Sequence, residues 1–200
     1  SGKVFADIIT GKANPSGKLP FTWPAARNDV PAHRLNAYPG VWRADHKIID
    51  EEYKEGLYVG YRGVDKFKTK PLFAFGHGLS YTSFKITNLR ADKHEMTRDG
   101  KITFTVNVKN TGKRKGSEVV ELYVNDVKSS LPRPFKELKG FTKVALNPGE
   151  SKDVSITIDN ASLSFYDDKK SEWVSESGAF KALIGNSSDH IIGEIGFVLR

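Results

Sequence analysis

Acidic side chains that lie close together in the chain are the first residues that could perform catalysis. Glycoside hydrolysis, for example, needs two carboxyl groups flanking the sugar. Glu51 and Glu52 are adjacent, so they face opposite ways in an extended chain, and Glu55 shares a face with Glu52 only in a helix. Asp167 and Asp168 fall in a predicted hairpin turn, where aspartate usually accepts hydrogen bonds from the backbone. We therefore expect no catalytic residue in this chain.

Motifs for phosphate, nucleophilic and metal chemistry are also incomplete. Residues 11–19 contain the glycines of a phosphate loop, but the spacing is one residue too long and Leu19 replaces the magnesium-binding hydroxyl. Residues 76–80 lack the Gly-x-Ser-x-Gly order of a nucleophile elbow. The five histidines are scattered and there is no cysteine, so we expect neither a metal site nor a cofactor. His77, between two glycines, is interpreted as a hydrogen-bonded structural residue.

Aromatic side chains form another group that could bind a ligand, because the C–H faces of sugars stack on aromatic rings. Tyr38 and Trp42 lie in residues 25–50, where few periodic signals predict a long loop. They are the candidate substrate-binding residues, at an outer subsite only, and a core or interface role is the alternative. Trp173 is interpreted as part of a β-sandwich core.

Composition excludes several classes of protein. The chain has 200 residues, is 38% hydrophobic and 28% charged, and carries a net charge of +7. The lysines are spread along alternating segments, which favours a solvated basic surface over a nucleic-acid site, so no nucleic-acid partner is expected. No apolar run is long enough for a membrane span. The start, Ser1-Gly2-Lys3, is interpreted as that of a processed or cut chain.

Residues 1–82 follow one pattern. Apolar residues at helical spacing from Val4 to Ile9 predict a short amphipathic helix that ends near Gly11. The prolines of residues 18–24 favour an irregular or edge-strand path. Residues 57–61 alternate like a short strand or an extended approach to one, and Gly76 and Gly78 indicate tight or positive-φ geometry.

Residues 83–200 follow another pattern, with a period of two. Apolar and polar residues alternate over residues 102–109, which predicts a half-buried strand. Further strands are predicted around residues 119–124, 138–146, 154–158, 173–174, 180–184 and 191–199, separated by turn residues. About seven short strands predict an immunoglobulin-like or fibronectin III-like sandwich. The fold class is α+β overall, with an incomplete α/β sandwich segment followed by an all-β sandwich.

The order of several motifs resembles the C-terminal part of family 3 glycoside hydrolases of the β-glucosidase type. In residues 1–82 the matching motifs are Gly11-Lys12-x-Asn14-Pro15-Ser16-Gly17-Lys18-Leu19-Pro20, Tyr53-x-Glu55-Gly56-Leu57-Tyr58 and Phe73-x-Phe75-Gly76-x-Gly78-Leu79-Ser80-Tyr81. In residues 83–200 they are Val106-x-Val108-x-Asn110-Thr111-Gly112, Lys136-Glu137-Leu138-Lys139-Gly140-Phe141 and Pro148-Gly149-Glu150. Together they cover essentially the whole chain.

The resemblance implies the end of an α/β sandwich domain in residues 1–82 and a fibronectin type III-like domain in residues 83–200. In that family both catalytic carboxylates precede this region, so no catalytic role is transferred. The implied function is a structural, accessory portion of a retaining exo-acting β-glycosidase that removes terminal sugars from β-linked oligosaccharides or glucosides. The implied partners are the N-terminal catalytic portion and a carbohydrate substrate. A secreted or periplasmic location and a homodimer are further expectations.

A non-catalytic sandwich module that binds a carbohydrate or a protein is the alternative. The two interpretations differ in what they expect of residues 1–75. An enzyme portion should expose a large apolar surface there, which only the N-terminal portion covers, and should be insoluble or partly unfolded alone. A binding module should instead carry a row of exposed aromatic side chains on one face of the sandwich.

Overall fold

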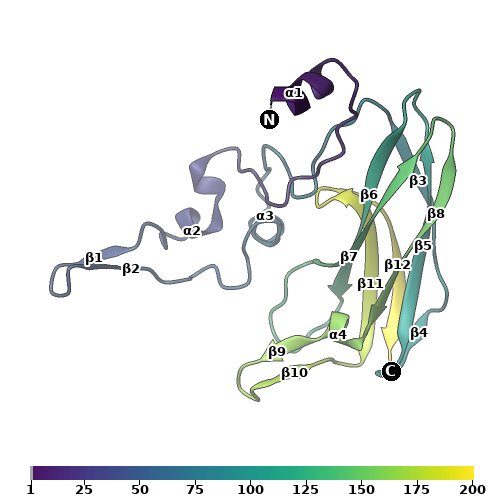
Figure 1. Cartoon of the computed structure of the whole chain (residues 1–200). Helices are drawn as coiled ribbons and strands as arrows, with labels where there is room; N and C mark the ends of the chain where they lie inside the picture. Colours follow the sequence, from purple (N-terminus) through teal and green to yellow (C-terminus); the bar gives the residue numbers. More distant parts are fainter. Residues whose placement is uncertain (1) are drawn as a thin grey trace.

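The computed structural model describes residues 2–200; Ser1, and with it the interpretation of the chain's start, lies outside the described residues. Figure 1 shows a tall β-sandwich on one side and an open arrangement of short elements on the other. The sandwich comprises a three-stranded sheet of order β3-β5-β8 and a five-stranded sheet of order β4-β12-β11-β6-β7. The α+β class and the predicted sandwich are therefore confirmed.

Most strands of the sandwich agree with the predicted alternation, except that residues 118–124 are buried without interruption. The three-stranded sheet contains β3 (Phe84–Ala91), β5 (Lys101–Asn110) and β8 (Ser151–Asp159). The five-stranded sheet contains β4 (Glu95–Met96), β12 (His190–Leu199), β11 (Gly178–Ser187), β6 (Gly116–Asp126) and β7 (Glu137–Leu146). A short helix α4 (Asn160–Leu163) and a two-stranded hairpin of β9 (Phe165–Asp167) and β10 (Glu172–Val174) lie at the lower end.

The core lies between the two sheets because alternate side chains of each strand point inward. In β5 the buried apolar positions are Ile102, Phe104, Val106 and Val108. Phe197 from β12 packs against two rings, with centroids 5.5 Å from Phe104 and 5.6 Å from Phe180. The sandwich thus has a hydrophobic core of its own.

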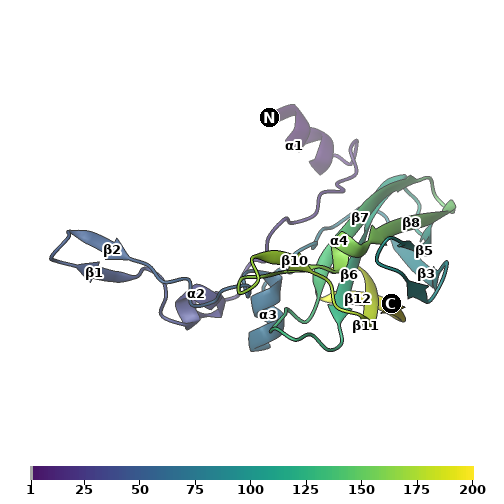
Figure 2. The same cartoon turned by 90° about the horizontal axis from the view of Figure 1, so that it is seen from below.

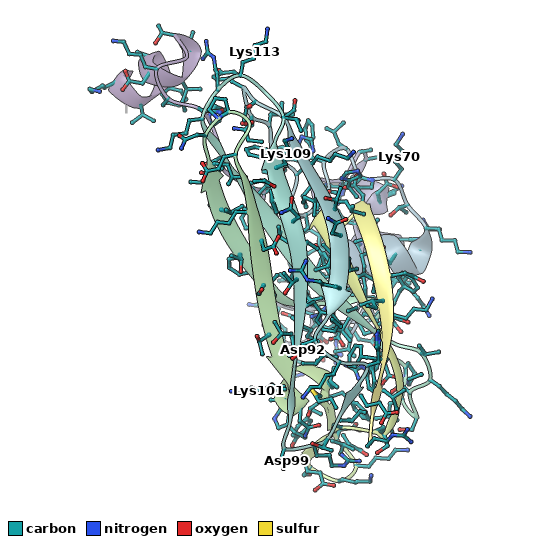
Figure 3. The ribbon with its side chains drawn as sticks, turned by 90° about the vertical axis from the view of Figure 1, so that its right-hand side faces the viewer. Lys70, Asp92, Asp99, Lys101, Lys109 and Lys113 are labelled. Carbon is teal, nitrogen blue, oxygen red and sulfur yellow. The ribbon has the colours of Figure 1, made fainter. Side chains whose placement is uncertain are left out.

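The outer face of the three-stranded sheet is polar, as the alternation predicts. Cross-strand hydrogen bonds join Thr103 to Thr157 and Thr105 to Ser155, at 2.9 and 2.8 Å. Figure 3 views the molecule from this side and shows Lys101 and Lys109 towards opposite ends of the sheet. This face therefore needs no further covering.

Residues 2–82 form short, separated elements. They are α1 (Gly2–Ile9), the 3₁₀ helix η1 (Arg27–Asp29), α2 (Pro31–Arg34), β1 (Val41–Arg43), β2 (Ile48–Asp50) and α3 (Tyr61–Phe67). The predicted helix and its end at Gly11, which has φ of +73°, are confirmed. The irregular path of residues 18–24 is also confirmed, since it makes an isolated bridge between Trp23 and Phe73.

Two predictions for residues 2–82 are wrong. Residues 25–50 are not one long loop, because β1 and β2 pair as an antiparallel hairpin. Residues 57–61 do not form a strand, because the chain turns at Gly60, with φ of +59°, and the helix α3 begins at Tyr61. The alternation in that block reflects a turn and a helix start, which a period of two cannot distinguish from a strand over so few residues.

Hydrogen bonds and ion pairs hold residues 2–82 against the five-stranded sheet. Lys18 pairs with Glu118 at 2.8 Å, and Lys136 pairs with Asp65 at 2.5 Å; both pairs are largely buried. The hydroxyl of Tyr61 accepts a hydrogen bond from the backbone N–H of Leu138 at 2.9 Å. The first pair fixes the segment around Lys18 on β6, and the other two contacts fix α3 beside β7. The interface between residues 2–82 and the sandwich is called here the joint. The exact boundary after residue 82 stays a prediction.

Candidate functional site

Large apolar side chains are exposed over residues 2–75. The buried residues in this range are all small or cyclic: Pro31, Ala37, Gly63 and Ala74. The helix α1 buries no residue, and Phe5 on it is 66% exposed. The exposed apolar residues of this range, called here the apolar face, are Val4, Phe5, Ile9, Phe21, Trp23, Tyr38, Val41, Trp42, Ile48, Ile49, Tyr53, Leu57, Val59, Leu72 and Phe73. The apolar surface expected for an enzyme portion is therefore confirmed.

An apolar cleft of about 480 Å³ lies within this face, between the proline-rich run and α3. Phe21, Val59 and Phe75 are among its lining residues. The hydroxyls of Thr22 and Thr69 also line it, and both are buried without a hydrogen-bond partner. Buried polar groups in folded proteins are almost always paired. The cleft therefore has the features of a binding site for hydrogen-bonding groups that residues 2–200 do not supply.

The hairpin of β1 and β2, called here the arm, carries the two predicted substrate-binding residues at its base and on its first strand. All six residues of its strands are exposed, and Figure 1 shows it extending far from the sandwich. Trp42 is 59% exposed and lies opposite Ile49. Tyr38 is 52% exposed, and its ring meets the ring of His33 edge-on at 5.0 Å. Both rings are available to a ligand, and no contact joins them.

The carboxylate pairs considered from the sequence are not catalytic pairs. Glu51 and Glu52 are exposed, and Glu52 pairs with Lys54 at 3.7 Å. The segment is not helical, so Glu55 does not share a helix face with Glu52. Asp167 accepts hydrogen bonds from the backbone N–H groups of Lys169 and Lys170, as expected for a turn. The absence of a catalytic residue from this chain stays a prediction.

Two other carboxyl groups, both partly buried, have raised pKa values, and both lie in the joint. Burial raises the pKa of Asp65, against the opposing effect of its hydrogen bond and charge interaction with Lys136. Burial also raises the pKa of Glu121, although the Tyr123 hydroxyl, which donates to it at 2.6 Å, and the Lys18 charge lower it. Altered pKa values often mark active sites. Here each group is bonded to the opposite part of the chain or to its own strand, which assigns them to the joint.

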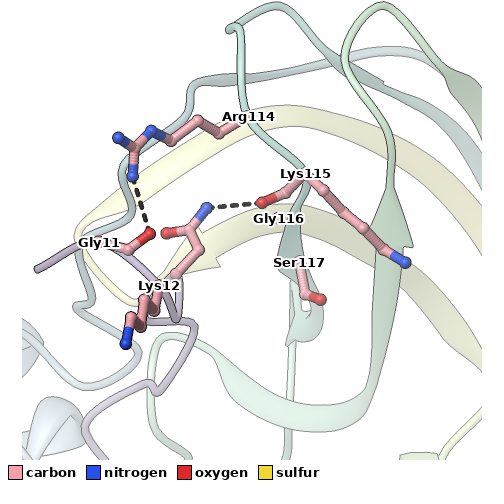
Figure 4. Close-up of a pocket in the computed structure, with 7 residues that line it drawn as sticks. Gly11, Lys12, Arg114, Lys115, Gly116 and Ser117 are labelled. Carbon is pink, nitrogen blue, oxygen red and sulfur yellow. Dashed lines mark hydrogen bonds between the residues drawn. The ribbon is translucent and has the colours of Figure 1, made fainter. Parts of the chain in front are cut away.

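A basic pocket of about 500 Å³ lies where the turn after α1 meets the start of β6. Arg114 donates to the backbone carbonyl of Gly11 at 3.1 Å, and Asn14 donates to that of Lys115 at 2.9 Å (Figure 4). The side chains of Lys12 and Lys115 point in different directions in Figure 4. Because the cations do not converge on one point, the pocket is a hydrogen-bonded part of the joint. Within residues 2–200, no three or more acidic or histidine side chains cluster as metal ligands.

Two structural interpretations of single residues need correction. Trp173 is not in the core: it is 71% exposed on the β9–β10 hairpin, where its ring contacts Tyr166. Its strand extends beyond the sandwich, which alternation alone could not show. The ring of His77 packs against Phe73, with centroids 4.9 Å apart, and its structural role rests on this contact instead of a side-chain hydrogen bond.

None of the helices in residues 2–200 has the length and apolar character needed to cross a membrane. The fold and the contacts together define a class of chain: a β-sandwich with its own core, joined to an α/β segment that lacks one. Residues 1–81 match the family described as "Glycosyl hydrolase family 3 C-terminal domain", and residues 118–188 match the "Fibronectin type III-like domain". The chain belongs to glycosyl hydrolase family 3 and corresponds to its C-terminal part.

Curated relatives and solved structures agree with this assignment. The chain is 46% identical to beta-glucosidase BoGH3A of Bacteroides ovatus over 98% of its own length, and 48% identical to thermostable beta-glucosidase B of Acetivibrio thermocellus over 96%. The crystal structure of a Bifidobacterium adolescentis GH3 beta-glucosidase matches 99% of the chain, with a TM-score of 0.88 and 34% identity. That of beta-glucosidase 3B from Thermotoga neapolitana matches 98%, with a TM-score of 0.86 and 37% identity. The chain spans about a quarter of the length of these proteins.

Proposed function

We propose that this chain is the C-terminal portion of a retaining exo-acting β-glycosidase, most simply a β-glucosidase, which removes terminal sugars from β-linked oligosaccharides or glucosides. The apolar face, apart from Tyr38 and Trp42 on the arm, carries the proposal, because so many exposed large apolar side chains in one part of a chain indicate a surface that a partner covers. The likeness to beta-glucosidases over a quarter of their length indicates what the cover is, namely the preceding catalytic portion. The catalytic carboxylates belong to that portion, and this chain supports them structurally.

The cleft between the proline-rich run and α3 is a specific binding site for the catalytic portion in this proposal. An apolar side chain from the catalytic portion would fill the space between Phe21, Val59 and Phe75. Backbone groups beside it would pair with the hydroxyls of Thr22 and Thr69, which otherwise remain buried and unpaired. A buried polar group left unpaired costs about 1–3 kcal/mol, so their pairing would contribute to the association.

Tyr38 and Trp42 are proposed as an outer subsite for the part of the substrate beyond the sugar that is cleaved. Both are exposed on the arm, which extends away from the sandwich. Exposed aromatic rings on a separate hairpin can stack on a sugar without disturbing the core. A role in polysaccharide degradation, a secreted or periplasmic location and a homodimer stay predictions, which fractionation of the source cells and sedimentation of the purified protein would test.

The test of the proposed function is the mass and activity of the intact protein that contains this sequence. An antibody against the sandwich would capture it from its source, and intact mass spectrometry would compare it with 22.2 kDa. We expect either a polypeptide several-fold larger or a tightly associated second chain, and hydrolysis of an aryl β-glucoside by the assembly but not by residues 1–200. A 22.2 kDa monomer that unfolds cooperatively and has no associated chain would overturn the proposal.

A further inference from the structure

The β9–β10 hairpin carries an exposed aromatic pair outside the apolar face. Tyr166 and Trp173 are directly opposite each other in the register, with ring centroids 5.7 Å apart and planes inclined by 70°. Both side chains are exposed, Trp173 to 71%. The two strands have three residues each, and an isolated two-stranded hairpin is marginally stable in water. A hairpin that presents two large rings to solvent gains most of its apolar burial only when another surface covers it.

The hairpin extends to the same side of the sandwich as the arm. In Figure 1 and in Figure 2, which views the molecule from below, the arm lies far to the left of the sandwich and the β9–β10 hairpin lies beside the sandwich on that same side. The opposite side presents the polar outer face of the three-stranded sheet (Figure 3). The exposed aromatic residues of the sandwich hairpin and of the arm are therefore directed to one side of the molecule.

Bonded contacts hold the β9–β10 hairpin on the sandwich, and others hold the segment around Lys18 and α3 on it. Arg133 anchors the β9–β10 region: it donates to the carbonyl of Leu163 at 3.0 Å, pairs with Asp126 at 3.1 Å and lies over the ring of Phe165. The sandwich is in turn fixed to residues 2–82 by the pairs Lys18–Glu118 and Lys136–Asp65. Because the β9–β10 hairpin is held in advance, a partner that touches it loses little free energy in ordering it.

We propose that the β9–β10 hairpin is a second contact site for the N-terminal catalytic portion, which would thus contact the sandwich as well as the apolar face. This inference rests on the proposed function. The occupant follows from the three quarters of the relatives' length that this chain does not span. It also follows from the position of the hairpin on the side of the apolar face. A glycan is the less suitable occupant, because two rings inclined by 70° do not form a flat stacking surface.

Thiol labelling of the full-length protein tests the inference, because residues 1–200 contain no cysteine and one introduced thiol reports one position. Three variants would be compared in the assembled protein: Trp173→Cys on the hairpin, Phe5→Cys on the apolar face, and Thr157→Cys on the polar outer sheet face. Peptide mass spectrometry would resolve any thiols in the rest of the protein. We expect the thiols introduced at positions 173 and 5 to react with a maleimide at least about tenfold more slowly than the thiol at position 157, since they react only after local opening.

The outcomes separate the two proposals. Fast labelling at position 173 with slow labelling at position 5 overturns the second contact site alone. Fast labelling at both positions overturns both the second contact site and the proposed function. Protection of the native Trp173 from hydroxyl-radical oxidation in the full-length protein only on addition of cellobiose or a soluble β-glucan would assign the hairpin to a sugar and overturn the second contact site. Hydroxyl-radical oxidation of the native Trp173 in the full-length protein gives the same comparison without a substitution, in case Trp173→Cys loosens the hairpin.

Discussion

Single charged residues determine how the two parts of the chain fit together. Lys18 and Lys136 each cross from one part to the other and meet a carboxylate in a largely buried position. Buried ion pairs contribute little net stability, because the loss of hydration offsets most of the attraction. An arrangement that buried these charges without a partner would cost much more free energy, however. The pairs therefore favour one orientation of residues 2–82 on the sandwich.

Glu121 provides a prediction at this scale. Burial raises its pKa in the folded state, so its folded pKa lies above its unfolded pKa. The stability that it contributes is then present below the unfolded pKa and lost as the pH rises through the folded pKa. We expect Glu121→Gln, which keeps an oxygen acceptor for Tyr123, to raise the free energy of unfolding at pH 7. The gain should disappear near pH 4, as measured by urea denaturation at both pH values.

Glu137 is the matched control for that prediction, because its shift has the opposite sign. Burial alone would raise the pKa of Glu137, but the charges of Lys139 and Arg133 outweigh it and lower the pKa. Its contribution is therefore present at neutral pH and lost as the pH falls through the folded pKa. Glu137→Gln should lower the free energy of unfolding at pH 7 by about 2 kcal/mol. Equal effects of the two substitutions at pH 7 would contradict the assignment of both shifts.

At the scale of elements, the sequence predicted the sandwich well and residues 25–61 poorly. Strands such as β5 have long alternating patterns and a core on one side, so the pattern in the sequence and the structure coincide. The arm has three residues in each strand and no buried face, which leaves no alternation to detect. Helix α3 depends on the positive φ at Gly60 and on the contact of Tyr61 with β7, and neither is a local pattern.

The candidate site shows the same limit. Tyr38 and Trp42 could be chosen because aromatic residues in a non-periodic segment are conspicuous. The cleft could not be predicted, since Thr22 and Thr69 lie far apart in the sequence and meet only in the fold. The hairpin turn at Asp167 and the strand at Trp173 were predicted, but the exposure of the β9–β10 hairpin was missed, because alternation does not tell whether that strand remains within the sandwich.

The arm gives a second prediction. Trp42→Ala should change the free energy of unfolding by less than about 0.5 kcal/mol, because the side chain is exposed. In the full-length enzyme it should raise KM for an oligosaccharide about fivefold, the equivalent of ~1 kcal/mol for one lost aromatic contact. The kcat for a short aryl glycoside should be unchanged. Val41→Ala, on the other face of the arm, is the control, and equal effects of both substitutions on KM would argue against the subsite.

The whole molecule is uneven in stability, because the sandwich has a core and residues 2–75 have none of their own. This division would allow one chain to contain a well-folded domain and still require the partner that we propose. Helix α1 is the clearest case: it has eight residues, buries none of them, and an isolated helix of that length is marginal in water.

A third prediction concerns the apolar face as a whole. Residues 1–200 alone should bind a hydrophobic dye such as ANS and associate at micromolar concentration, and the assembled protein should do neither. Replacing Val4, Phe5 and Ile9 by serine should reduce dye binding while the melting of the sandwich stays the same, because none of the three is buried. Weak dye binding by the unaltered chain would show that the apolar face is closed without a partner.

The contacts of the joint also determine when it can form as the protein is made. Asn14 bonds to Lys115 across 101 positions, and Lys143 bonds to Ser16 across 127. A ribosome adds about 5–20 residues per second. The sandwich strands that contact residues 2–82 are therefore synthesised roughly ten seconds after these residues. A catalytic portion encoded upstream would already be folded by then and could shelter the waiting segment. The sandwich would then fold last and would stabilise contacts that residues 2–82 had already made with the catalytic portion.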